Sequence, residues 1–316
     1  MKLRFEKSSY GIYIFNFSNG ESISLNDMSF REKGPLLLDV SITNRCFRGC
    51  SFCYRKAQPS GQDISLNDYI IVLDQATKCG VTQIAIGGGE PTLHPKFVEI
   101  LKTTREFGII PNYSTNGDCL TKDIIDATKN YCGAIAISIY NEIEKYESLV
   151  KLLKSSNILV NFHFILTDEN LSYLISLLKS PPTWFQYLNA IIFLNFKPAN
   201  GENEKLLKYA NKNDLELFFK LATSFRLCSI GFDTCSYGFI KRYTTIDTSL
   251  FDYCEASRKS AYINEKLEVS PCSFYKDSGS NLHNMSLQEI WNKNPLFTKH
   301  RTQLEKCKKC PIYDID

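Results

Sequence analysis

No run in the 316-residue sequence approaches the ~18 consecutive apolar residues of a membrane-spanning helix. The first ten residues alternate charged and apolar side chains and lack the apolar core of a secretory signal. The formal net charge of +3 is too small to argue for a nucleic-acid partner. The sequence also lacks internal repeats and low-complexity segments. We therefore expect a cytoplasmic protein that binds no membrane and no nucleic acid.

Cysteine, in contrast, is abundant, with 12 residues. Secreted disulfide scaffolds are small, whereas this chain is 43% hydrophobic and long enough for a substantial core. In the cytoplasm, clustered cysteines indicate metal binding or catalysis more often than disulfides. The cysteines are therefore the first candidates for the chemistry of this protein.

Residues 36–225 alternate between short runs typical of strands and longer segments with helical spacing. Six strand–helix pairs are predicted, with strands at 36–43, 81–86, 109–114, 134–139, 158–166 and 189–195, and helices at 66–78, 97–107, 121–128, 143–154, 171–179 and 214–223. A last short strand follows at 229–232. This alternation predicts an α/β fold whose parallel sheet is curled into a partial barrel or doubly wound. In both architectures the chemistry belongs at the carboxyl ends of the strands.

The two ends of the chain differ from this pattern. Residues 1–35 indicate a short strand pair, with a turn at Ser18-Asn19-Gly20. Past residue 240 the helical periodicity fades, and residues 286–292 give the one convincing helix. We therefore expect an N-terminal hairpin extension at 1–35, a barrel at 36–240 and a small metal-stapled module at 241–316.

A first cysteine group, Cys46, Cys50 and Cys53, stands directly after the first parallel strand with the spacing C-x3-C-x2-C. Thiolates are soft ligands that suit iron–sulfur clusters or zinc. Three of them on one tight loop can bind three corners of a four-iron cluster and leave the fourth iron open to a small molecule. A structural zinc site needs a fourth protein ligand, and none lies nearby in the sequence. Three buried free cysteines are the remaining alternative.

This loop, with the aromatic Phe52 before its last cysteine, resembles the signature of the radical S-adenosylmethionine superfamily. The resemblance implies a partial (β/α)6 TIM-like barrel. It also implies a 4Fe–4S cluster, held by Cys46, Cys50 and Cys53, whose open iron is chelated by S-adenosylmethionine. One electron from the cluster then breaks a carbon–sulfur bond, and the 5′-deoxyadenosyl radical abstracts hydrogen from a substrate. An external one-electron donor such as flavodoxin or ferredoxin is implied as well.

The next predicted strand ends in Gly87-Gly88-Gly89-Glu90-Pro91, which is similar to the glycine–glycine–glutamate–proline motif of that family. Glycines let a backbone approach a ligand closely, and Glu90 can accept hydrogen bonds from an ammonium group. A simple turn is the alternative reading. The resemblance implies that S-adenosylmethionine is bound by Gly88, Gly89, Glu90 and Pro91, together with Phe52.

Three polar residues at later strand ends are weaker candidates. Ser114 and Asn116 resemble the family's ribose-contacting segment, and Ser138 stands where the family often has a polar residue near the methionine carboxylate. Each can equally be a polar cap of its strand. His163 lies on the same strand face as Asn161 and either approaches the active site or is a satisfied core histidine.

A second cysteine group contains Cys254 and Cys272, eighteen residues apart, and a C-x2-C pair, Cys307 and Cys310. Four thiolates from two distant segments complete a site for zinc or for a second iron–sulfur cluster. The segment resembles the shortened, "twitch" form of the SPASM auxiliary-cluster extension, which implies one auxiliary 4Fe–4S cluster held by these four residues. The glycine that usually precedes the second cysteine is missing, because Glu265-Lys266 occupies that turn.

Cys235 differs from the other cysteines because it follows a strand late in the barrel series, two residues after Asp233. Some radical peptide epimerases return a hydrogen atom from such a thiol, and Asp233 is then its acid–base partner. Cys235 can also bind the auxiliary cluster or belong to the core. Small buried positions are the expectation for the remaining thiols, Cys79, Cys119, Cys132 and Cys228.

Enzymes with this extension frequently modify ribosomally made peptides, so the resemblance implies an oxidoreductase that matures a peptide by crosslinking, epimerisation or side-chain oxidation. The alternative is a twitch-type dehydrogenase or cyclase that acts on a small molecule. A non-catalytic metal or redox protein is disfavoured by the intact Gly88-Gly89-Glu90 segment. The N-terminal strand pair offers an edge to which an extended peptide substrate can add as a further strand.

Overall fold

The computed structural model describes residues 3–8, 11–17, 22–25, 30–140, 143–201, 203–275 and 279–315. Two compact units make up the chain. Unit 1 contains Met1–Gly49, Arg55–Ile135 and Glu255–Thr302, and unit 2 contains Cys50–Tyr54, Ala136–Cys254 and Gln303–Asp316. Each unit is described by itself below.

Unit 1 begins with a small antiparallel sheet of three strands in the order β1-β2-β3. These strands are β1 (Leu3–Ser8), β2 (Gly11–Asn16) and β3 (Ser22–Leu25). A third strand therefore joins the predicted pair. The predicted turn at residues 18–20 lies outside the described residues.

The main sheet of unit 1 has the strand order β6-β5-β4-β11-β12. The parallel strands β4 (Leu37–Thr43), β5 (Gln83–Gly88) and β6 (Ile110–Thr115) were predicted. From the C-terminal region, β11 (Ser260–Ile263) pairs in parallel with β4, and β12 (Val269–Ser270) pairs antiparallel with β11. The C-terminal module thus extends the same sheet.

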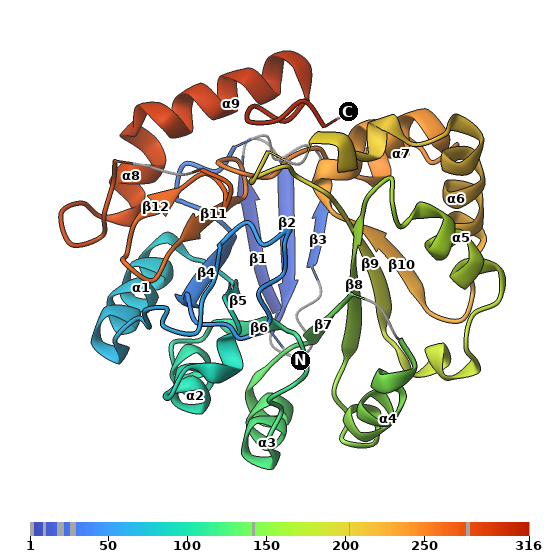
Figure 1. Ribbon diagram of the computed structural model, residues 1–316. Helices are drawn as coiled ribbons and strands as arrows, with labels where there is room; N and C mark the ends of the chain where they lie inside the picture. The colour runs from blue at the N-terminus through green and yellow to red at the C-terminus, as the bar shows by residue number, and fades with distance from the viewer. Residues whose placement is uncertain are drawn as a thin grey trace. The chain divides into compact units, whose positions relative to one another are not determined.

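Helices α1 (Leu66–Cys79), α2 (Phe97–Glu106) and α3 (Lys122–Tyr131) lie along the outer face of β4, β5 and β6 (Figure 1). In β4 the alternate residues Leu38, Val40 and Ile42 are fully buried, because successive side chains point to opposite faces of a strand. Helix α1 begins as predicted at Ser65, whose hydroxyl accepts the Asp68 amide, and ends at a left-handed glycine, Gly80.

Unit 2 contains four neighbouring strands in the order β7-β8-β9-β10, namely β7 (Ile135–Ile139), β8 (Val160–Leu166), β9 (Ala190–Asn195) and β10 (Ser229–Phe232). Its helices are α4 (Glu147–Ser155), α5 (Leu171–Lys179), α6 (Lys212–Ser224) and α7 (Tyr237–Tyr243). Aromatic rings fill the core, where Phe193 meets Phe218 edge-on at a centroid distance of 5.0 Å.

The prediction of a single helix past residue 240 is wrong. Helix α8 (Leu287–Lys293) matches it, with a capping box between Ser286 and Glu289, but α9 (Pro295–Cys307) follows. The buried residues of α9 have regular helical spacing, yet two of the four are polar, which hides the apolar stripe: Phe297, His300, Arg301 and Leu304.

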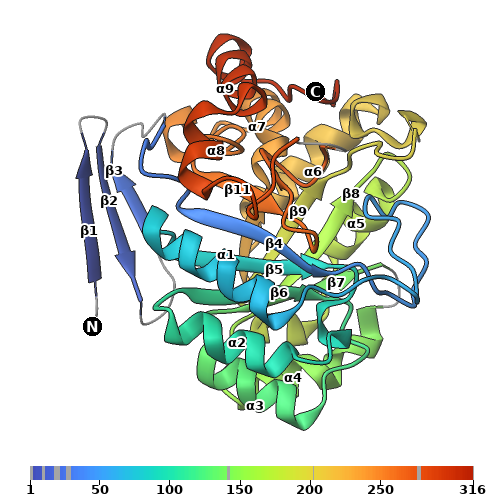
Figure 2. The same ribbon diagram turned by 90° about the vertical axis from the view of Figure 1, so that its left-hand side faces the viewer.

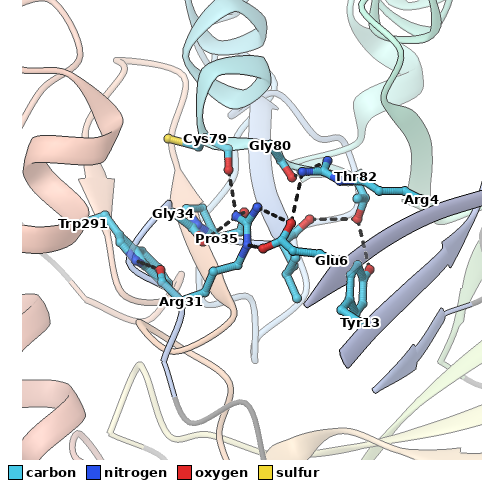
Figure 3. A network of polar contacts seen from close by, with 11 residues as sticks. Arg4, Glu6, Tyr13, Arg31, Gly34, Pro35, Cys79, Gly80, Thr82 and Trp291 are labelled. Atoms are coloured by element: carbon cyan, nitrogen blue, oxygen red, sulfur yellow. Dashed lines mark hydrogen bonds and ion pairs between the residues drawn. The ribbon is translucent and has the colours of Figure 1, made fainter. Parts of the chain in front are cut away.

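A polar network fixes the N-terminal sheet of unit 1 to the amino ends of β4 and β5 (Figure 3). Buried Arg31 forms an ion pair with Glu6 and donates a 2.7 Å hydrogen bond to the Cys79 carbonyl. Arg4 donates to the Gly80 carbonyl at 2.9 Å, three residues before β5 begins. Figure 2 shows β1–β3 beside the start of β4. This sheet therefore lies at the end of β4 opposite to the one that leads into the first cysteine loop.

No helix in the described ranges has the length and hydropathy needed to cross a bilayer.

Candidate active site

The first cysteine loop follows the carboxyl end of β4, and its first residues are held by hydrogen bonds within unit 1. The Cys46 amide donates to the Gln58 carbonyl at 3.1 Å, which closes the loop backbone. The guanidinium of Arg45 forms an ion pair with Asp63 at 2.7 Å, and the hydroxyl of Thr43 binds the same carboxylate. The first predicted cluster ligand is thus held in a defined place.

The rest of this loop belongs to unit 2. The Cys53 amide donates to the Cys50 carbonyl at 3.1 Å, which forms a tight turn between the two thiols. The side-chain amide of Asn200 donates to the backbone carbonyls of Ser51 and Cys53. All three cysteines of the loop are half-buried and free of disulfides. Their donor set of thiols alone fits an iron–sulfur cluster.

The aromatic Phe52 stacks on Tyr140, with a centroid distance of 5.5 Å. It also packs against a small buried cluster in unit 2: Phe196, Leu206 and Ile315. Its ring therefore supports the turn between Cys50 and Cys53 from the protein side.

Two glycines of the motif at the end of β5 are required by close backbone packing. A side chain on Gly88, whose φ is +128°, would lie 2.1 Å from the Thr43 carbonyl oxygen, and one on Gly89 would lie 2.1 Å from that of Arg45. The amides of Gly89 and Glu90 donate to these two carbonyls, each at 2.7 Å. The motif therefore lies directly against the residues that precede Cys46.

Glu90 is almost completely buried, with 2% exposure. Its carboxylate accepts hydrogen bonds from the amide and hydroxyl of Thr92, the hydroxyl of Thr115 at 2.7 Å and the amide of Asn116 at 2.7 Å. These bonds tie the end of β5 to the end of β6. Pro91 starts a short 3-10 turn, Pro91–Leu93. Thr115, which the sequence analysis did not single out, is thus a partner of Glu90.

The loop after β6 contains the predicted Ser114 and Asn116. Asn116 is 8% exposed, and its side-chain oxygen accepts the Asp118 amide at 2.8 Å. Arg48, from the cysteine loop, binds both carboxylate oxygens of Asp118 at 2.8 and 2.9 Å. Ser114 is half-buried on β6.

Cys119, expected to be a small core residue, lies in the same loop. Burial raises the pKa of its thiol, and the nearby groups Glu90, Asp118 and Cys46 raise it further. Cys119 is therefore a neighbour of the first predicted ligand, and its spacing in the sequence gave no signal of this.

In unit 2, Ser138 is half-buried on β7. His163 on β8 has its pKa lowered to about 4 by burial, against the opposing charge of Asp233. Its imidazole is therefore neutral at pH 7 and can serve as a hydrogen-bonding group.

Asp233 and Cys235 follow β10 and meet a cation that the sequence analysis missed. Lys197 lies just after β9, and its ammonium donates to Asp233 Oδ2 at 2.8 Å and to the Asn195 carbonyl at 2.9 Å. Burial alone would lower the pKa of Lys197, but Asp233 and Cys235 raise it overall. The other carboxylate oxygen of Asp233 accepts the Ser236 hydroxyl. Lys197 and Asp233 thus form a buried ion pair beside Cys235.

The thiol of Cys235 lies near other cysteine thiols of unit 2. Burial raises its pKa well above the usual value, Lys197 opposes this, and the charges of Cys254 and Cys310 add to the rise. Cys235 and Cys310 both pack against one apolar cluster, formed by Phe196, Leu206 and Ile315. Cys235 is thus a neighbour of two predicted auxiliary ligands.

The remaining auxiliary cysteines are placed differently. Cys307 is exposed at the end of α9, and its thiol donates to the Gln303 carbonyl at 3.2 Å. Cys272 lies in unit 1, where its carbonyl accepts the Ser270 hydroxyl at 2.9 Å. Within the described ranges, no three His, Cys, Asp or Glu side chains gather around a point that would suit a single metal ion.

A cavity of about 780 Å³ opens in unit 2 away from these groups. It is lined by residues at the amino ends of β8, β9 and β10, among them Val160, Asn189 and Ser229. The predicted cofactor residues of an α/β barrel lie at the opposite, carboxyl ends of the strands. The cavity therefore contributes nothing to the candidate site.

Two family models match the chain. The model described as "Radical SAM superfamily" matches residues 40–141, and the model described as "Iron-sulfur cluster-binding domain", SPASM, matches residues 254–311. The first range contains Cys46, Cys50 and Cys53, and the second contains the four predicted auxiliary cysteines.

Similar proteins agree with these matches. A PqqA peptide cyclase of Bradyrhizobium diazoefficiens is 31% identical over 91 residues, which span 28% of this chain and 24% of that enzyme. The chain thus spans about a quarter of the length of this curated relative. Streptococcus suis SuiB bound to S-adenosylmethionine has a TM-score of 0.75 at 16% identity, covering 99% of this chain and 93% of SuiB. SuiB bound to its precursor peptide SuiA has a TM-score of 0.74 at 14% identity, covering 95% and 89%.

The structural likeness shows that the fold is the expected α/β partial barrel with a C-terminal extension. The implied cofactors are a 4Fe–4S cluster, an auxiliary cluster and S-adenosylmethionine, and they fit the all-thiol donor sets described above. The chain therefore carries a domain of the radical S-adenosylmethionine superfamily at residues 40–141 and an iron–sulfur cluster-binding domain of the SPASM type at residues 254–311.

Proposed function

We propose that this protein is a radical S-adenosylmethionine enzyme that modifies a ribosomally synthesised peptide. The observation that carries the proposal is the direct attachment of the Gly88–Glu90 segment to the residues before Cys46, through two 2.7 Å backbone hydrogen bonds. When bound, the cluster supplies one electron to cleave S-adenosylmethionine into a radical that removes a hydrogen atom from the substrate. An external donor such as flavodoxin or ferredoxin would deliver that electron.

The chain's own residues would bind and orient the cofactors. Cys46, Cys50 and Cys53 would hold the first cluster. Glu90 would fix the two strand ends between which the cofactor is bound, because it accepts hydrogen bonds from Thr92, Thr115 and Asn116. Its Oε2 accepts one of these bonds and would still be able to accept another from an ammonium group of the cofactor. The other cofactor contacts would come from residues at strand ends: Phe52, Gly88, Gly89, Pro91, Ser114, Asn116 and Ser138.

Cys254, Cys272, Cys307 and Cys310 would hold one auxiliary 4Fe–4S cluster. The burial of Cys235 next to Cys254 and Cys310 favours a place for this thiol beside the auxiliary cluster over a place as hydrogen-atom donor. Asp233 would then hold Lys197 close to that centre, as their 2.8 Å contact indicates.

A peptide substrate is supported by what the similar proteins act on or bind, a peptide cyclase by name and SuiB with its precursor peptide. The N-terminal sheet remains a candidate edge for an extended peptide. Because it is fixed to the amino ends of β4 and β5, a segment paired there would be far from Cys46. It would therefore serve recognition, and the reacting residue would lie further along the peptide.

The test is anaerobic reconstitution, followed by iron and sulfide counts and a 5′-deoxyadenosine assay under dithionite. We expect about eight irons per chain and formation of 5′-deoxyadenosine. Candidate peptides encoded near this gene are then added, and a mass change in one of them supports the peptide reading. A mass change confined to a small molecule supports the alternative dehydrogenase or cyclase. Well-folded protein without iron or 5′-deoxyadenosine would contradict the proposal.

A further inference from the structure

An acidic residue stands in the middle of β4 on the face that the helices leave uncovered. Leu38 and Val40 point to the helix-covered face, so Asp39 between them points to the other. Within the described residues, Asp39 interacts with the positive charge of Arg55, and no hydrogen-bond donor reaches the Asp39 carboxylate. Burial raises the pKa of Asp39 to about 7, and Arg55 offsets only part of that rise.

The positive charge of Arg55 is already engaged by another group. Its guanidinium forms an ion pair with Glu265, and both side chains are largely buried, at 14% and 7% exposure. The hydroxyl of Ser41 donates to the same Glu265 oxygen at 3.1 Å. Glu265 thus has two donors, whereas none of the described chain reaches Asp39. When Asp39 is ionised, the set of two carboxylates and one guanidinium has an excess of negative charge.

Open space adjoins the Asp39 carboxylate. A methyl group placed on Gly87 would have one atom of the described chain within 4 Å, the Oδ1 of Asp39 at 4.0 Å. On Gly88 and Gly89 the same group would collide with backbone at 2.1 Å. In the sheet register Gly87 pairs with Ser41, two residues along β4 from Asp39. The space therefore lies between the Asp39 carboxylate and the cofactor motif.

We propose that Asp39, with the space at Gly87, receives the positively charged end of a substrate side chain, a lysine ammonium or an arginine guanidinium. This inference rests on the proposed function and names the chemistry of its substrate. A cation there would supply the missing hydrogen-bond donors and balance the excess negative charge. A substrate carboxylate would meet two negative groups, Asp39 and Glu265, and would be rejected.

The position of this pocket suits a substrate group. Asp39 lies four residues before Thr43, which corresponds to about 13 Å along the strand from the start of the cysteine loop. A lysine or arginine side chain covers only part of this distance, so the substrate backbone would also have to enter past the carboxyl ends of the strands. The pocket would therefore anchor the substrate and not take part in the chemical step.

The test measures binding of three small probes to the reconstituted holoenzyme by anaerobic calorimetry. The probes are N-acetyl-lysine methylamide, its Nε-acetylated form and N-acetyl-glutamate methylamide. We expect wild-type enzyme to bind the lysine probe best, and Asp39→Asn to bind it about tenfold more weakly, because a hydrogen bond between charged groups is lost. The Nε-acetylated and glutamate probes should not respond to this substitution.

Two further variants sharpen the test. Gly87→Ala places a methyl group in the open space and should weaken the lysine probe while Asp39 stays intact. Asp74→Asn makes the same charge change on the exposed face of α1, where Asp74 pairs with Lys78, and is the matched control with no expected effect. Equal affinity of wild type and Asp39→Asn for the lysine probe, or no binding by wild type at millimolar concentration, would overturn the inference.

Failure of this inference is distinguishable from failure of the proposed function. A wild-type enzyme that forms 5′-deoxyadenosine but shows no preference for the lysine probe defeats the pocket alone. A wild-type enzyme that forms none defeats the proposed function. Loss of 5′-deoxyadenosine formation in Asp39→Asn without any probe would assign the carboxylate to cofactor binding and would also overturn the inference.

Discussion

Replacement of Asp39 by asparagine should stabilise this protein at alkaline pH. Burial disfavours the charged form of this carboxyl group and raises its pKa in the folded chain to about 7, from an ordinary value of 3.8. Below pH 4 both states are protonated and the group has no effect on the free energy of unfolding. Between pH 4 and pH 7 the unfolded chain releases the proton while the folded chain keeps it, so stability falls as the pH rises. Above pH 7 the full penalty is present.

The size of the effect follows from the shift. A pKa raised from 3.8 to about 7 sets a ceiling of about 4 kcal/mol, because each tenfold change in proton affinity is worth ~1.4 kcal/mol. Asp39 borders open space that water can enter, so we expect about half of this ceiling, or about 2 kcal/mol. For a chain of this length, that corresponds to a rise in the unfolding midpoint of about 3 °C.

The measurement is thermal unfolding of reconstituted wild type and Asp39→Asn, followed by circular dichroism at one scan rate, at pH 5 and at pH 8. The gain at pH 5 should be less than half of the gain at pH 8, because the penalty has only begun to develop. Asp74→Asn should show no such pH-dependent gain, because its carboxylate is 49% exposed. An equal gain at both pH values would show that ionisation of Asp39 is not the cause, and a loss of stability at pH 8 would refute the reasoning.

Three other predictions concern the metal sites and the N-terminal sheet. Cys46→Ala should lose about four irons and all 5′-deoxyadenosine formation, and retained formation would contradict its place in the first cluster. Cys272→Ala should also lose about four irons but keep some 5′-deoxyadenosine formation while the yield of modified substrate falls; full product yield would contradict a substrate or electron role for the auxiliary cluster. Arg31→Leu leaves the half-buried Glu6 carboxylate without its main partner and should lower the free energy of unfolding by about 2 kcal/mol in denaturant titrations, and an unchanged value would show that this network does not fix the sheet.

Local sequence patterns were sufficient for most of the barrel. The segment from β4 to β5 follows its prediction closely, because the apolar spacing, the Ser65 cap and Gly80 agree with one another. The apolar pattern failed to predict a helix where polar side chains form part of its buried face. In α9 the buried face includes His300, which is hydrogen-bonded to Tyr275, and Arg301, which donates to the carbonyls of Ser257 and Trp291.

The missing glycine before Cys272 shows how a departure from a family pattern can be accommodated. The turn that Glu265-Lys266 occupies takes its left-handed residue at Leu267, with a φ of 63°. The side chain of Asn264 supports the turn by accepting the amides of Lys266 and Glu268. Glu265 is thereby free to face Arg55, so the sequence feature that departs from the family also provides a residue of the proposed pocket.

The candidate site was predictable where its residues are neighbours in the sequence and not where they meet through folding. The cysteine spacing and the glycine motif were local signals. The pairing of Arg55 with Glu265 joins residues 210 positions apart, and that of Lys197 with Asp233 joins residues from two different strand ends. No period or spacing in a single sequence reports such contacts, because each partner alone reads as a polar surface residue.

The effects of Asp39→Asn on stability and on binding should have opposite signs, and this opposition separates a functional residue from a structural one. A half-buried carboxylate that no donor of the described chain reaches lowers the stability of the folded chain when it ionises. Asparagine has nearly the same shape and would remove this ionisation penalty. If Asp39 serves only packing, its replacement should lower the stability of the protein and leave the binding of the lysine probe unchanged. If Asp39 serves recognition, Asp39→Asn should raise the stability of the protein and lower its affinity for the lysine probe, because a bound cation offsets the unfavourable charge of the empty pocket. If Asp39→Asn raises stability without changing the affinity for the lysine probe, Asp39 destabilises the fold without binding substrate, and the proposed pocket is refuted.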